Sequence, residues 1–152
     1  MFLNLDKKMV LVYDLKDRLR KEPSYMELIQ KVTLDDNKPN IGLKGRYGLF
    51  GSIEWWQNIE NAVIKTSLVQ GEIVRLYKAG QDDMDEYNSF DLLLDSGELW
   101  SESIYLTDIK NKSLFKLKSK VSIFYVHDER KGSIDTNEVT YSNTVIEMAV
   151  SQ

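Results

Sequence analysis

The chain has 152 residues, of which 42% are hydrophobic and 29% are charged, and its formal net charge is -4. This length and apolar content suffice for one domain with a core and argue against intrinsic disorder. With no cysteine and one histidine, disulfide frameworks, thiolate zinc sites and cysteine nucleophiles are excluded. No apolar run approaches a signal-peptide core or the roughly 18 residues of a membrane span, so we expect a cytoplasmic protein without membrane contact.

The N-terminal part predicts two helices. Apolar residues recur there at a spacing of three to four, which is typical of an amphipathic helix: Leu5, Met9, Val12, Leu15 and Leu19. A strand over residues 10–13 is the alternative, because β-branched and aromatic residues favour strands. Pro23 is expected to end this element. Ser24 and Glu27 then match a capping box and predict a short helix toward Val32, with a strand over residues 25–34 as its alternative.

A glycine-rich loop is predicted over residues 35–51. Its glycines recur at every third position, where each permits a positive φ or a close backbone approach: Gly42, Gly45, Gly48 and Gly51. Ser52 is a good N-cap for a helix running to about residue 62. Trp55 and Trp56 point about 100° apart on that helix, so we expect one in the core and the other exposed as a partner-binding anchor.

The remaining chain predicts five short strands. Residues 69–77 and 90–94 form the first two, and Asp95-Ser-Gly97 is a hairpin turn leading to a third over residues 99–106. Thr107 or Asp108 caps a short helix through Leu114. Alternating apolar residues then predict the last two strands: Val121, Ile123 and Tyr125, followed by Ile146, Met148 and Val150.

This order of five strands, with a helix between the third and fourth, resembles the OB-fold over about residues 69–150. The resemblance implies an α+β protein whose helical N-terminal part packs on a five-stranded OB-like Greek-key β-barrel. We expect a single domain over residues 1–152, with helices and the glycine-rich loop in 1–66 and the barrel in 67–152. A different small barrel or a sandwich is the alternative.

Charge is distributed unevenly along the chain. Between Lys78 and Lys110 the chain contains no basic residue but nine acidic ones: Asp82, Asp83, Asp85, Glu86, Asp91, Asp95, Glu98, Glu102 and Asp108. Such an interval repels phosphate and attracts a basic partner. The acidic turn lacks the spacing of an EF-hand calcium loop. The sequence therefore predicts a partner-binding surface, with no catalytic residue, metal ligand or cofactor.

The leading hypothesis is a non-catalytic binding protein whose acidic face masks a basic partner. In general character the chain is similar to bacterial immunity proteins and antitoxins, which neutralise nuclease toxins by occupying their nucleic-acid site. The candidate partner-binding residues combine acids with the two tryptophans: Asp82, Asp83, Asp85, Glu86, Glu98, Glu102, Trp55 and Trp56.

The alternative hypothesis is an OB- or KH-like module for single-stranded nucleic acid. Residues 41–45 resemble the I-G-x-x-G loop of KH domains, which clamps a nucleic-acid backbone, and the candidate residues are Lys44, Arg46 and Tyr47. The acidic interval argues against this alternative, because phosphate affinity depends on basic side chains. The loop also lacks the G-K-[ST] ending of a nucleotide-binding P-loop.

Overall fold

A computed structural model describes residues 1–80, 86–132 and 138–152. The chain divides into two compact units. The sheet unit contains residues 1–14, 68–124 and 146–152, and the helical unit contains residues 15–67 and 125–145. Whether both belong to one domain, as the sequence predicts, stays a prediction. Within the described ranges no helix is both long and apolar enough to cross a bilayer.

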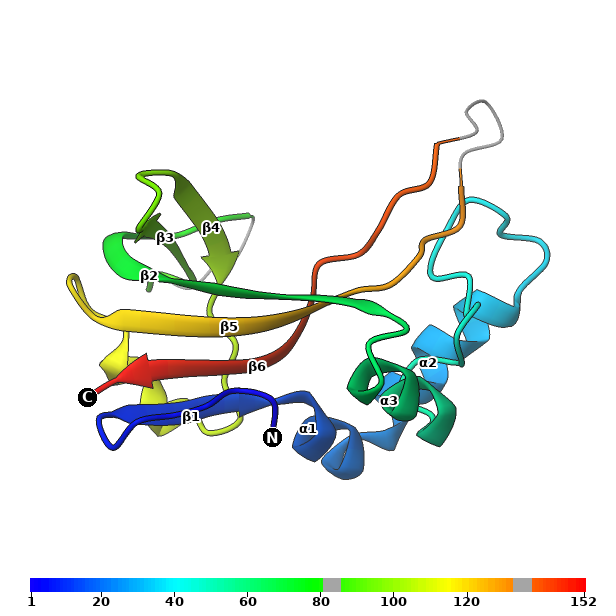
Figure 1. The fold of residues 1–152 in the computed structure, drawn as a ribbon, viewed down its shortest axis with the longest axis horizontal. Helices are drawn as coiled ribbons and strands as arrows, with labels where there is room; N and C mark the ends of the chain where they lie inside the picture. The colour runs from blue at the N-terminus through cyan, green and yellow to red at the C-terminus, as the bar shows by residue number, and fades with distance from the viewer. Residues whose placement is uncertain (81–85, 133–137) are drawn as a thin grey trace. The chain divides into compact units, whose positions relative to one another are not determined.

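A six-stranded sheet has the order β1-β6-β5-β2-β3-β4, and the pairs β1/β6, β2/β3 and β3/β4 are antiparallel (Figure 1). The strands are β1 (Met9–Asp14), β2 (Lys65–Tyr77), β3 (Ser89–Leu94), β4 (Leu99–Ser103), β5 (Lys120–His127) and β6 (Thr144–Ser151). The α+β class is therefore confirmed. The closed, five-stranded OB-like barrel is wrong, because the sheet is open, with β1 and β4 at its edges, and has a sixth strand.

The sixth strand is β1, which lies where the apolar spacing predicted a helix. Val10 and Leu11 pair with Val150 and Ala149 of β6, and a short helix α1 (Leu15–Lys21) follows directly. The strand alternative for residues 10–13 is thus correct. The predicted apolar face of an amphipathic helix is present only in α1, where Leu15 and Leu19 are buried.

The helical unit contains α1, α2 (Pro23–Leu34) and α3 (Ile53–Glu60). α1 ends at Lys21, just before Pro23, as expected, and Pro23 also opens α2, since a proline at the first helical position loses no intrahelical hydrogen bond. The Ser24 capping box is wrong, because Glu22 is the N-cap and makes no side-chain capping bond. The Ser52 cap is confirmed: its hydroxyl accepts a hydrogen bond from the Trp55 N–H at 3.2 Å.

Local signals of the sheet unit are also confirmed. Gly97 has a φ of 87° in the β3–β4 turn, and Asp108 caps the short 3-10 helix η1 (Ile109–Leu114) by accepting from the Lys110 N–H. One face of the sheet carries the core of this unit, in which Ile73, Phe90 and Phe115 are fully or almost fully buried.

The N-terminal segment lies against the sheet. The carboxylate of Glu147 on β6 accepts hydrogen bonds from the backbone N–H groups of Phe2 and Leu3 at 2.9 and 2.7 Å. The Phe2 ring stacks on Phe124 of β5 with centroids 4.8 Å apart. These contacts fix residues 2–3 and thereby position the residues that follow them beside the strands.

Candidate functional site

The sheet unit carries a groove of about 470 Å³, which we call the sheet groove. Four separate stretches of chain line it: the N-terminal segment with the start of β1, β2, the end of β3, and the start of β5. Its lining residues are Asn4, Leu5, Asp6, Met9, Gln70, Gly71, Glu72, Leu93, Leu94, Asp95, Lys120, Val121 and Ser122.

The sheet groove is acidic. Among the described residues of the lining, Asp6, Glu72 and Asp95 contribute carboxylates, and Lys120 contributes an ammonium group. All four residues are exposed, so their charges face solvent. Clustered like charges in a concave surface concentrate the field and raise the local concentration of ligands with the opposite charge. The arrangement favours a cationic ligand.

Gly71 permits β2 and β3 to approach closely at the groove. A Cβ at this position would lie 2.7 Å from the backbone oxygen of Leu93, a distance that side-chain carbons do not adopt. Glycine in a strand interior often marks such a close approach of two backbones.

Apolar side chains continue from the groove across the same face of the sheet. Glu72 pairs with Leu93, and Leu93 pairs with Leu99, so all three side chains lie on one face. Leu93 is 44% exposed and Leu99 is 63% exposed. Exposed leucines beside charged residues are typical of a protein–protein interface, which combines an apolar centre with a polar rim.

The predicted acidic residues do not all converge on this groove. Asp82, Asp83 and Asp85 lie outside the described residues. Glu86 forms an ion pair with Lys112 at 2.7 Å. Glu98 is exposed in the β3–β4 turn that also contains Asp95, whereas Glu102 pairs with Phe90 on the face opposite to that of Leu99.

Some acids of this interval are also neutralised by bases that are distant in sequence or adjacent to its end. Asp91 lies 3.7 Å from an Arg75 guanidinium nitrogen and accepts a hydrogen bond from the Ser101 hydroxyl at 2.6 Å. Asp108 lies 3.4 Å from the Lys110 ammonium group. Several described acids of the interval are therefore neutralised by ion pairs, and Asp95 lines the groove.

The two tryptophans lie in different environments of the helical unit. Trp55 is fully buried, packs against Phe50 with centroids 4.9 Å apart, and donates its indole N–H to Asp128 at 2.9 Å. Trp56 is half-buried, and the Lys16 ammonium group lies 5.0 Å from its ring centroid. Only Trp56 thus offers surface to a partner without rearrangement of the core.

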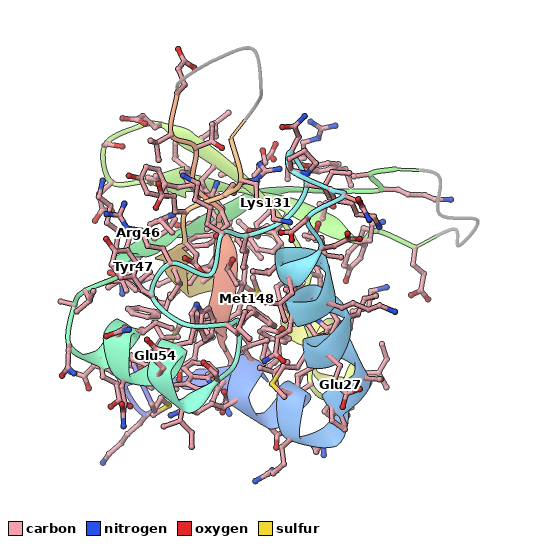
Figure 2. All side chains as sticks on the ribbon, turned by 90° about the vertical axis from the view of Figure 1, so that its right-hand side faces the viewer. Glu27, Arg46, Tyr47, Glu54, Lys131 and Met148 are labelled. Carbon is pink, nitrogen blue, oxygen red and sulfur yellow. The ribbon has the colours of Figure 1, made fainter. Side chains whose placement is uncertain are left out.

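The basic residues of the glycine-rich loop are engaged by an acid of the same unit. The Lys44 ammonium and the Arg46 guanidinium lie 3.3 and 3.4 Å from the two carboxylate oxygens of buried Glu129. Figure 2 shows Arg46 and Tyr47 side by side on this loop, and the Tyr47 carbonyl accepts a hydrogen bond from Asn58. Lys44 and Arg46 therefore stabilise the fold by pairing with the Glu129 carboxylate.

These ion pairs determine the ionisation of Glu129. Burial alone would raise the pKa of its carboxyl, but the hydrogen bonds and charges of Lys44 and Arg46 outweigh burial and hold the pKa below its usual value. A carboxyl whose pKa is lower in the folded than in the unfolded state stabilises the fold above its unfolded pKa. That stabilisation is lost as the pH falls through the folded pKa.

Replacing both Lys44 and Arg46 by alanine is therefore expected to destabilise the protein at pH 7 by about 1 to 3 kcal/mol, because a buried carboxylate loses its partners. The loss should shrink as the pH falls, since Glu129 is protonated first in the variant, which lacks the two cations, and then in the unmodified protein, whose pKa they lower. Urea unfolding of both proteins at pH 7 and pH 3.5 measures this. Equal stability at pH 7 would contradict the role of the ion pairs.

Asp128 and His127 form a second polar cluster in the helical unit. Burial raises the pKa of the Asp128 carboxyl, although hydrogen bonds from Trp55 and from the Glu129 N–H oppose this. The Ser67 hydroxyl lies 2.6 Å from His127 Nε2, and His127 Nδ1 lies 3.0 Å from the Ser142 carbonyl oxygen. His127 Nδ1 thus contacts a backbone carbonyl, whereas the corresponding ring nitrogen of a catalytic triad is bound by a carboxylate. In the described ranges no three side chains form a metal-binding group.

Comparison with known protein families decides the classification. The family model for immunity protein RhsI2 matches residues 9–151, which is almost the whole chain. The chain belongs to the RhsI2 immunity protein family. No curated protein matches it. The general likeness to bacterial immunity proteins is therefore confirmed, and family membership supports an inhibitory role, since immunity proteins generally act without catalysis.

Proposed function

We propose that this protein neutralises a toxin by binding a basic surface of it in the sheet groove. The observation that carries the proposal is the groove itself, in which three exposed carboxylates and one ammonium group lie beside exposed leucines. Membership of an immunity protein family supports a toxin as the partner. The toxin would be met in the cytoplasm.

A nuclease toxin fits this chemistry. Enzymes that act on nucleic acid bind phosphate through lysine and arginine side chains. Carboxylates held in a groove replace the phosphates as partners of those cations, so the bound inhibitor covers the substrate site. Complementary charges also accelerate association, and this acceleration decreases as salt is added.

The nucleic-acid-binding alternative gains no support from the site. Lys44 and Arg46 are paired with Glu129, and the sheet groove would repel phosphate. We therefore advance toxin inhibition alone.

The test first asks whether a neighbouring reading frame encodes a toxin and then uses that toxin. Co-expression of this protein should restore growth of cells that produce the toxin, and calorimetric titration against a catalytically inactive toxin should give an affinity that weakens with added salt. Labelled single-stranded DNA and RNA serve as controls in fluorescence anisotropy. Absence of toxin binding, or micromolar binding to the nucleic acids, would overturn the proposal.

A further inference from the structure

The outer edge of β4 presents backbone groups to solvent. The Leu94 N–H donates to the Glu98 carbonyl at 2.9 Å, and the Ile104 N–H donates to the Asn88 carbonyl at 2.8 Å. Because hydrogen-bonded and non-bonded pairs alternate along an antiparallel ladder, Trp100 and Glu102 direct their N–H and C=O groups toward β3. The residues between them in sequence therefore direct theirs outward.

The two edges of the sheet differ in how far they are covered. At β1, the Thr107 N–H donates to the Val12 carbonyl at 2.7 Å, and the Thr107 hydroxyl accepts from the Asp14 N–H. At β4, the Ser103 N–H is bound by the Glu102 carboxylate at 2.8 Å. Among the described residues no further strand pairs with β4, so Leu99 and Ser101 form an open stretch of edge.

We propose that the toxin binds by adding an extended basic segment as a further strand along the outer edge of β4. This inference rests on the proposed function and specifies how the toxin is held. Backbone hydrogen bonds to Leu99 and Ser101 provide the pairing, as in other complexes formed by strand addition. Alternate side chains of the added segment contact exposed Leu99 on one face, while the nearby carboxylates of Asp95 and Glu98 attract its cations.

Charge favours a basic partner over a second copy of this chain. Exposed edge strands are prone to pair with one another, and acidic side chains at the edge oppose this. If β4 paired with β4 of another copy, Glu98 and Glu102 of the two copies would approach one another. Like charges opposed across strands destabilise the pairing, whereas lysine or arginine at those positions stabilises it.

The test compares Ser101→Pro with Ser101→Ala. Proline removes the outward N–H and leaves the hydrogen bonds to β3 intact, a placement that edge strands tolerate. Alanine removes the same hydroxyl bond to Asp91 but keeps the N–H, so it is the matched control. For the inactive toxin identified in the test of the proposed function, we expect the Kd to rise at least about tenfold with proline and less than about twofold with alanine.

Amide hydrogen exchange gives a second measurement on the unmodified protein. Binding of the toxin should slow exchange at the amides of Leu99 and Ser101, while those of Trp100 and Glu102 are already protected by β3. If Ser101→Pro does not fold, the hydrogen-exchange measurement alone tests strand addition. Tight binding with unprotected Leu99 and Ser101 amides, or with equal affinity of a folded proline variant and the alanine variant, would overturn strand addition and leave the proposed function standing. Absence of toxin binding by the unmodified protein would remove both.

Discussion

Reversing two groove charges, in a Glu72→Lys and Asp95→Lys double variant, is expected to weaken toxin binding by about 100-fold or more. Each substitution removes a carboxylate and places an ammonium group where the toxin presents its own cations. The melting temperature should stay nearly constant, because exposed charges contribute little to folding. Calorimetric titration with the inactive toxin and thermal unfolding measure the two effects separately.

Glu27→Lys provides the control for net charge. Glu27 is an exposed residue of α2 in the helical unit, so one such substitution changes the charge without altering the sheet groove. We expect its Kd to lie within about threefold of the unmodified protein, since a charge outside the groove lining acts mainly through screened long-range steering. If Glu27→Lys weakened binding as much as either single groove substitution, net charge would explain the effect and the groove would not be the site.

Gly48→Ala is expected to lower the free energy of unfolding by at least about 3 kcal/mol. Gly48 has a φ of 111°, and a Cβ there would lie 2.8 Å from the backbone nitrogen of Trp55. The Trp55 backbone N–H donates the capping hydrogen bond to the Ser52 hydroxyl. The Trp55 backbone therefore cannot move away from residue 48 without loss of that bond. Urea denaturation measures the change.

Gly97→Ala separates backbone strain from this steric overlap. Gly97 has a φ of 87°, but a Cβ there meets no atom of the described residues within 4 Å. We expect a loss of about 1 kcal/mol, which is the cost of a left-handed conformation for a residue with a side chain. Equal losses at Gly48 and Gly97 would contradict the close approach of the glycine-rich loop to α3.

The elements that sequence reasoning located correctly depend on neighbouring residues. Ser52 and Asp108 cap helices through N–H groups two or three residues away, and Gly97 forms a turn within its own hairpin. The helix predicted around Met9 failed because its apolar spacing fits a strand followed by a helix equally well. The choice is made by β6, which pairs with β1 from the other end of the chain. Closure of the barrel likewise depends on long-range pairing that no local pattern encodes.

The candidate site was predictable only in part. The sequence located an acidic interval, but the clustering of acidic residues along the sequence does not show which carboxylates lie close together in the fold. Asp6 and Glu72 lie outside that interval and line the groove, whereas Asp91 within it is paired with Arg75. The exposed alternate positions of β2 carried a signal for Glu72, since a charged residue in a half-buried strand faces solvent.

The position of β6 has a consequence for when the sheet groove can form. It is the last of the six strands to leave the ribosome, yet it occupies the place between β1 and β5. A growing chain therefore holds β1 and β5 without their shared neighbour, and the N-terminal wall of the groove lacks Glu147, to which Phe2 and Leu3 are bound. Under the proposed function, the groove would be complete, and able to bind a toxin, only after translation has passed β6.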